Sequence, residues 1–141
     1  MDHSLPSTRD AEAAVQPLEA GKWRPASLGG RDALLALYAE DFVTVEYGAN
    51  PHGGVERKTD IRAVLASENG QRLVAMLDGT AFELSEWCFV HPAPGAVVAS
   101  YRVRAAAFAW DAYATSVWAW RAGRWQTVFY QASRTAVAPA A

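Results

Sequence analysis

The alternation of apolar and polar residues is most regular in the second half of the chain. From about Ala81 to Arg134 the sequence is rich in Val, Tyr, Phe, Trp and Thr, with interruptions at HPAPG, around AWDA and at RAG. β-Branched and aromatic residues favour strands, and breaks that contain Gly or Pro favour turns. The pattern therefore predicts a meander of four strands.

The stretch between Ala96 and Phe108 separates its side chains onto two faces. Successive side chains of a strand point to opposite sides of the sheet, so every second residue shares a face. One face carries only apolar or aromatic residues, namely Val97, Ala99, Tyr101, Val103 and Ala105. The other face, with Ser100, Arg102 and Arg104, is expected to be wet or to line a polar site.

The last two strands form a hairpin whose register has two solutions. A three-residue loop with Gly123 in the left-handed region gives a bulge, pairs Trp120 with Arg124 and brings four residues to one face: Trp118, Trp120, Val128 and Tyr130. A two-residue turn instead pairs Trp120 with Trp125. We favour the bulge, because the shorter turn forces Ala122 to a positive φ.

The first half of the chain predicts helices. The stretch from Arg9 to Leu18 can begin a helix, but Pro17 removes an amide donor, so this helix is expected to be short or bent. RDALLALYAEDF, residues 31–42, has helical spacing and leads into a short strand, VTVEYG. A further helix is expected to start at a Thr59 cap and to end near Asn69 and Gly70.

Composition limits the class of protein. The 141 residues are 51% hydrophobic and 20% charged, which fits one globular domain, here taken as residues 9–135 with flexible termini at 1–8 and 136–141. The net charge of −2, without a basic run, gives no support for nucleic-acid binding. No apolar stretch is long enough to span a membrane, so we expect a cytoplasmic protein.

Two motifs carry a resemblance to a known superfamily. ALYAEDFVTVEYG resembles the passage from helix to strand in the nuclear transport factor 2-like, or cystatin-like, superfamily. TSVWAWRAGRWQTVFYQAS is similar to the terminal hairpin of its SnoaL-like branch, whose activities are largely uncharacterised. The resemblance covers about Arg31 to Thr135, and the chain departs from it earlier, where Pro17, Pro25 and a Gly pair interrupt the usual long helix.

The resemblance implies an α+β fold in which a cone of curved antiparallel sheet wraps around N-terminal helices. It also implies a mostly apolar pocket and a homodimer formed through the sheet. The superfamily holds isomerases, cyclases, dehydratases and hydrolases beside non-catalytic modules, so the fold does not select a function. We expect a domain that binds a small apolar or aromatic molecule; a proton-transfer enzyme and a non-catalytic dimerisation or partner-binding module remain open.

Three residues are candidates for catalysis. Asp41 could act as a base if burial raised its pKa, although an exposed position at a helix end is the simpler expectation. Tyr38, three residues earlier, could donate to a developing oxyanion or only pack in the core. His52 could be an alternative base if its loop overhangs the cone mouth, or could simply be solvated.

Aromatic residues are the candidates for ligand binding, because six tryptophans are a heavy load for this length. The candidates are Trp87, Tyr101, Trp118, Trp120 and Tyr130. The same residues could instead fill the core or a dimer interface. No histidine has a metal-ligand spacing and there is no Gly-rich phosphate loop, so we expect neither a metal nor a cofactor.

Overall fold

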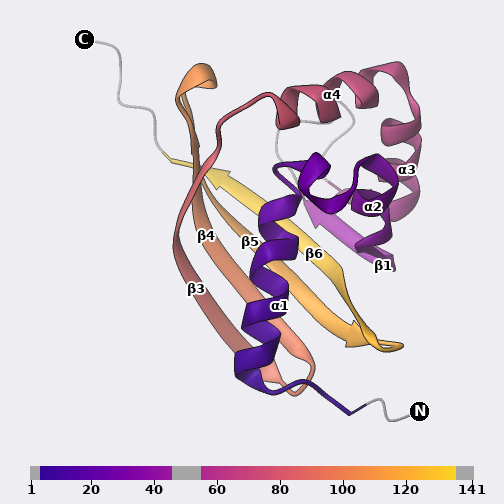
Figure 1. Ribbon diagram of the computed structural model, residues 1–141, viewed down its shortest axis with the longest axis vertical. Coiled ribbons are helices and arrows are strands. Elements are labelled where there is room, and N and C mark those ends of the chain that lie inside the picture. The colour runs from indigo at the N-terminus through magenta and orange to yellow at the C-terminus, as the bar shows by residue number, and fades with distance from the viewer. Residues whose placement is uncertain (1–3, 46–54, 136–141) are drawn as a thin grey trace.

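The computed structural model describes residues 4–45 and 55–135 of the chain (Figure 1). Within these ranges, the chain has the helices and strands of an α+β fold. The helices are α1 (Thr8–Gly21), η1 (Pro25–Leu28), α2 (Arg31–Ala36), α3 (Lys58–Ala66), α4 (Glu68–Asp78) and η2 (Ala106–Phe108). The strands are β1 (Tyr38–Val45), β2 (Val55–Arg57), β3 (Glu83–Ala93), β4 (Ala96–Ala105), β5 (Trp110–Arg121) and β6 (Arg124–Arg134).

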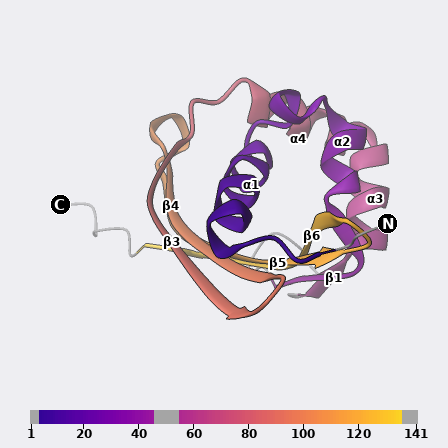
Figure 2. The same cartoon turned by 60° about the horizontal axis from the view of Figure 1, so that its bottom comes forward.

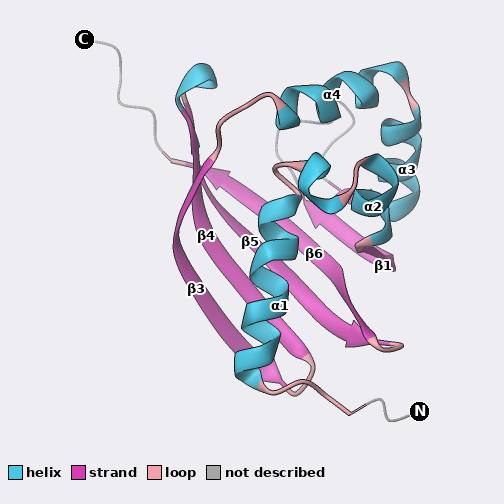
Figure 3. Cartoon of the chain, in the orientation of Figure 1, coloured by secondary structure: helices cyan, strands magenta, loops and turns pink. Residues whose placement is uncertain are grey.

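The described strands form one curved, open sheet in the order β2-β1-β6-β5-β4-β3. β3 to β6 are the antiparallel meander that the sequence predicts, whereas β1 joins the sheet by parallel pairing with β6. Helix α1 lies across the concave face, and α2, α3 and α4 close the space beyond its C-terminal end (Figures 1 and 2). Coloured by secondary structure, α1 to α4 lie on the concave side of the sheet, whereas η2 lies at its end, between β4 and β5 (Figure 3).

The core lies between α1 and this concave face. The apolar face predicted for β4 is confirmed, because its five residues are all buried: Val97, Ala99, Tyr101, Val103 and Ala105. Ala11 and Val15 of α1 pack against β4 and against two buried tryptophans, Trp118 and Trp125. Arg102, on the opposite face of β4, instead forms an ion pair with Asp111.

The β5–β6 hairpin has the two-residue turn, so our preference for the bulge was wrong. Trp120 pairs with Trp125, as only the shorter turn allows. Ala122 has a φ of 51° and Gly123 a φ of 75°, the left-handed values of a type I′ turn. A left-handed Ala costs roughly 1–2 kcal/mol. The edge-to-face contact of the Trp120 and Trp125 rings, 5.5 Å between centroids, helps to offset that cost.

An irregularity in the hairpin lies farther from the turn. The register shifts between Val117 and Trp118, so that Trp118 stands opposite Thr127. Tyr130 follows the shift and lines the cavity described below, whereas Val128 falls within the irregular stretch. The bulge is therefore present in β6, but not at the turn.

Helix α1 is not short, although it contains Pro17; the other alternative, that the helix is bent, stays a prediction. It runs for 14 residues and includes that proline. Pro17 and Ala13, one turn earlier, are both exposed. Water can therefore satisfy the Ala13 carbonyl that lacks a helical partner, which lets the helix continue.

The helix predicted for residues 31–42 ends earlier than expected. α2 stops at Ala36, and β1 begins at Tyr38. The Leu37 carbonyl accepts a hydrogen bond of 2.8 Å from the Thr127 amide of β6. Because sheet pairing replaces helical hydrogen bonds at this point, Tyr38 and Asp41 belong to a strand and not to a helix.

The helix expected from Thr59 to about Gly70 is in fact two helices. α3 begins one residue earlier, at Lys58, and ends at Ala66. Ser67 then caps α4, its hydroxyl accepting a 3.1 Å hydrogen bond from the Gly70 amide. A Cβ at Gly70 would lie 1.8 Å from the Val64 carbonyl oxygen. The close approach of α3 and α4 therefore requires glycine at position 70, which lies in the first turn of α4 and does not end a helix.

Candidate functional site

A cavity of about 410 Å³ lies between the C-terminal end of α1, strands β1 and β6, and helices α2 to α4. Most of its described lining is apolar. The apolar lining residues are Trp23, Leu34, Phe42, Ile61, Val64, Leu65, Leu73, Val74 and Leu77. The polar or amphipathic ones are Lys22, Tyr38, Thr44, Glu56 and Tyr130. The composition is that of a site for a small, largely apolar molecule.

A buried ion pair lies at the end of α1 that meets the cavity. Glu19 and Lys22 are three residues apart on successive turns, and the Lys22 Nζ lies 3.1 and 3.2 Å from the two Glu19 carboxylate oxygens. Glu19 is fully buried, and Lys22 is 8% exposed. Lys22 lines the cavity and Glu19 does not. The Lys22 Nζ lies 4.4 Å from the centroid of the Tyr130 ring, which also lines the cavity, so the charge lies beside the hollow.

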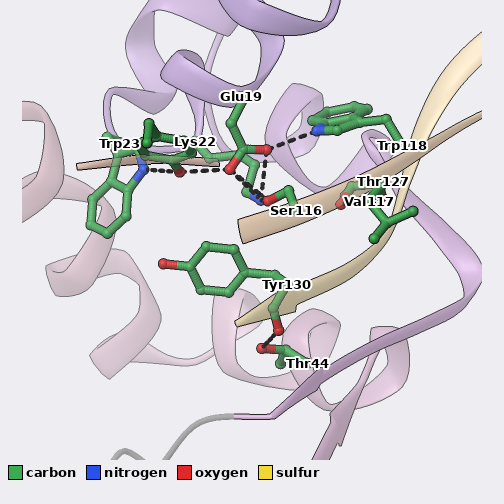
Figure 4. Close-up of polar contacts among 10 residues, drawn as sticks. Glu19, Lys22, Trp23, Thr44, Ser116, Val117, Trp118, Thr127 and Tyr130 are labelled. Carbon is green, nitrogen blue, oxygen red and sulfur yellow. Dashed lines mark hydrogen bonds and ion pairs between the residues drawn. The ribbon is translucent and has the colours of Figure 1, made fainter. Parts of the chain in front are cut away.

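Three neutral donors from the sheet also reach the Glu19 carboxylate, and Figure 4 labels two of them, Ser116 and Trp118. Oε1 accepts from the Tyr101 hydroxyl at 2.6 Å and from the Ser116 hydroxyl at 2.7 Å. Oε2 accepts from the Trp118 indole Nε1 at 2.8 Å. A buried carboxylate is tolerated only when its oxygens are well supplied with donors. These contacts occupy Glu19 as an acceptor and hold it rigidly.

Tyr101 connects this carboxylate to the wall of the cavity. Its hydroxyl donates to Glu19 and accepts a 2.7 Å hydrogen bond from the Trp23 indole Nε1. Burial, followed by the negative charge of Glu19, raises the pKa of Tyr101 well above its usual value. Tyr101 therefore keeps its proton and remains a donor at any ordinary pH.

Lys22 is held by further groups of the sheet. Its Nζ donates to the Ser116 hydroxyl at 3.0 Å and lies 4.4 Å from the centroid of the Tyr130 ring. Thr44, beside Tyr130 across the β1–β6 pair, donates its hydroxyl to the Tyr130 carbonyl at 2.9 Å. An ammonium over an aromatic ring gains a cation–π attraction. The position of the charge is therefore set by α1, β5 and β6 together.

The three residues predicted for catalysis have different positions. Tyr38 lines the cavity. Asp41 does not; it is exposed on β1, and its carboxylate forms an ion pair of 2.6 Å with Arg121. The hydrogen bond from Arg121 lowers the pKa of Asp41, the opposite of what a base in an apolar pocket needs. His52 lies outside the described residues.

Among the aromatic residues predicted to bind a ligand, Tyr130 lines the described part of the cavity. Trp118 and Tyr101 are buried in the core and donate to Glu19. Trp87 stacks on Tyr101 with 4.5 Å between ring centroids, and Trp120 packs against the cluster around Val15. None of these four side chains is among the described residues that line the cavity. Tyr101 and Trp118 contact Glu19 beside it, whereas Trp120 belongs to the packed cluster around Val15.

The sequence interpretation missed Glu19, Lys22 and Ser116. A signal was present, because Ala11, Val15 and Glu19 follow one another at intervals of four and share the buried stripe of α1. A carboxylate on an otherwise apolar stripe needs a buried partner. Lys22, one turn further along, is that partner.

The described residues show neither a metal-binding cluster nor a membrane-spanning helix. Across ranges 4–45 and 55–135, no three His, Cys, Asp or Glu side chains gather in a way that could hold a metal ion. In the same ranges, no helix is both long enough and apolar enough to cross a membrane.

No protein-family model and no curated protein matches this chain. Solved structures do match it. A nuclear transport factor 2-like protein of unknown function from Pseudomonas putida KT2440 is 19% identical, with a TM-score of 0.65 over 92% of this chain and 89% of that one. A protein of unknown function with a cystatin-like fold, from Nostoc punctiforme, is 15% identical, with a TM-score of 0.63 over 96% and 98%.

An enzyme is also among the similar structures. The hexachlorocyclohexane dehydrochlorinase LinA-type3 from Novosphingobium barchaimii LL02 is 13% identical, with a TM-score of 0.65 over 94% of this chain and 92% of that one. At identities this low, structural similarity shows a shared fold and is not evidence for a shared activity. The fold predicted from the two sequence motifs is thereby confirmed.

Proposed function

We propose that this domain of nuclear transport factor 2-like fold binds a small, largely apolar molecule in the cavity beside Lys22. The observation that carries the proposal is the cavity itself. Its volume of about 410 Å³ lies within the range of roughly 300–1,000 Å³ typical of small-molecule sites, and nine apolar side chains line it.

The helical side of the cavity offers apolar surface that a ligand would cover. Val64 of α3 is 43% exposed and Leu73 of α4 is 41% exposed, although both line the hollow. Removing apolar surface from water gains roughly 25 cal/mol per Å². A ligand packed between these helices and β1 would therefore be stabilised mainly by burial.

Catalysis by Asp41 has no support in this geometry, because that carboxylate is exposed and paired with Arg121 outside the cavity. The dehydrochlorinase among the similar structures is named for a small chlorinated ring. That name supports a small-molecule role for the fold without selecting a reaction for this chain.

Two neighbouring positions on α4 provide the test. Leu77 lines the cavity, whereas Met76 does not. We expect the neutral fluorescent probe N-phenyl-1-naphthylamine to bind the native protein. Leu77→Trp should fill the hollow and weaken that binding by about tenfold or more, a loss of roughly 1.4 kcal/mol.

Met76→Trp is the matched control and should leave the dissociation constant unchanged. Fluorescence titration gives the dissociation constants, and circular dichroism establishes that both variants are folded. Absence of binding to the native protein, or equal affinity of folded Leu77→Trp, would contradict the proposal.

A further inference from the structure

We infer that the ligand carries an anionic head group, a carboxylate, that Lys22 binds in the cavity. This inference rests on the proposed function and adds to it the chemical class of the ligand. Three features of the site support it: the position of the cation, the position of its counter-ion, and the position of the other charged lining residue.

Lys22 is the one basic side chain among the described residues that line the cavity. Its side chain is only 7% exposed, so its charge is poorly screened by solvent. A charge-assisted hydrogen bond to an ammonium is stronger than a neutral one, and more so where water is scarce. An oxygen acceptor brought to Lys22 would therefore gain more than it would at the surface.

Glu19 stands behind Lys22 and outside the cavity lining, so an incoming ligand meets the cation first. The Glu19 charge is also spread over three neutral donors at 2.6 to 2.8 Å, which direct the positive ends of their dipoles toward it. The pair is therefore asymmetric as seen from the hollow, with its positive side toward the ligand.

Glu56 is the other charged residue of the described lining, and its negative charge disfavours an anion beside it. It lies on β2, opposite Thr44 of β1, and is half-buried. Its carboxylate would repel an anion placed beside it. An anionic head group is therefore favoured at the Lys22 end, with the apolar body toward α3 and α4.

Glu19 acts in this scheme as a positioning residue. Both of its oxygens hold the Lys22 Nζ, and the sheet fixes Glu19 through Ser116, Tyr101 and Trp118. Removing the Glu19 charge would leave Lys22 without its buried counter-ion. An anionic ligand could then supply the missing charge and should bind more tightly.

A matched ligand series on the native protein tests the head group. Naphthalene-2-carboxylate, naphthalene-2-carboxamide and 2-naphthylmethylammonium share one apolar body and differ in charge. Titration calorimetry at pH 7.5 should rank the carboxylate roughly tenfold or more ahead of the carboxamide, as expected for a charge-assisted hydrogen bond. The ammonium compound should bind most weakly.

Variants with opposite expected effects test the residues. Lys22→Met should bring the carboxylate down to the affinity of the carboxamide, whereas Glu19→Gln should widen the gap between them. The double variant Glu19→Gln/Lys22→Met leaves no buried charge unpaired and should bind carboxylate and carboxamide equally. Lys58→Met is the control, because Lys58 is equally buried but pairs with Glu40 away from the described cavity lining.

The outcomes separate the two proposals. If none of the three naphthalene compounds binds, the proposed function itself fails. If carboxamide and carboxylate bind equally to the native protein, only the anionic head group is refuted. A carboxylate preference that survives in the double variant would refute the role of Lys22, even if the single variants fail to fold.

Discussion

The two ends of the concave face differ in how completely side chains fill them. Around Ala11 and Val15, helix α1 packs directly on the sheet, and Trp118 fills the space with no exposed surface. Around Lys22 the helix has ended, and a cavity of about 410 Å³ lies between strands β1 and β6 and helices α2 to α4. Helix α1 therefore packs in a dry core at its N-terminal end and borders the cavity at its C-terminal end.

The boundary between these regions is polar. Glu19 and Lys22 lie where the packed stripe of α1 ends, and the sheet supplies Tyr101, Ser116 and Trp118 as donors to Glu19. Burying an ion pair contributes little stability compared with apolar packing. The tryptophans and alanines therefore stabilise the fold, and a role for this charge pair at the hollow end is what we propose above.

The largest expected effect comes from truncating the packed end. Trp118→Ala should lower the free energy of unfolding by about 3–5 kcal/mol, because it opens a cavity and removes a donor from buried Glu19. Leu77→Ala at the hollow end should cost only about 1 kcal/mol, because that side chain already borders empty space. Urea unfolding measures both. Equal losses would contradict the contrast between the ends.

An intermediate effect is expected at the boundary. Tyr101→Phe should cost about 1–3 kcal/mol, because Glu19 loses a donor and the Trp23 indole loses its acceptor. Tyr113→Phe, whose hydroxyl is exposed and has a 3.4 Å contact to Glu86, should change stability by less than about 0.5 kcal/mol.

Tyr101→Phe also tests how the stability of the protein depends on pH in the alkaline range. The usual pKa of a tyrosine is 10.0, and the pKa of Tyr101 in the folded protein is higher. Above pH 10 the unfolded chain therefore loses the Tyr101 proton, whereas the folded protein keeps it. The contribution of Tyr101 is full below pH 10 and is lost as the pH rises further. The native protein should therefore lose stability above pH 10 more steeply than Tyr101→Phe. Matching slopes would show that Tyr101 is not held protonated by its surroundings.

The smallest effect is expected at Asp41, on the outside of the hollow end. Asp41→Asn should leave N-phenyl-1-naphthylamine affinity unchanged and lower stability at pH 7 by about 0.2–1 kcal/mol, as for an exposed ion pair. Since its folded pKa is depressed, the contribution exists above the usual 3.8 and is lost as the pH falls below it. A large loss of probe affinity in Asp41→Asn would contradict the position of Asp41 outside the binding site.

The meander was predictable because period-two alternation is a local property of the chain. The hairpin register was not, because the strain of Ala122 is local while the Trp120–Trp125 contact that accompanies it depends on packing. The end of α2 was also hidden. Tyr38 and Phe42 are four apart, which fits a helix, but pairing with β6 draws them into a strand.

The site was predictable only in part. Tyr38, a candidate for catalysis, and Tyr130, a candidate for ligand binding, both line the cavity, and their roles stay predictions. Trp118 and Tyr101 were chosen for their rings, yet the structure uses their N–H and O–H groups on Glu19. Which side of an aromatic residue meets a ligand depends on contacts between distant segments, and these cannot be inferred from spacing along one strand.

The parallel pairing of β1 with β6 has a consequence for the order of folding. β1 ends at Val45, and its main partner begins only at Arg124. Glu19 likewise accepts hydrogen bonds from Ser116 and Trp118, which are 97 and 99 residues away in the sequence. Contacts of such long range slow folding, because the loop entropy is lost before they form. We therefore expect the N-terminal helices to gain their sheet contacts late, and the hollow to be completed only when β6, the last of the described strands, has paired.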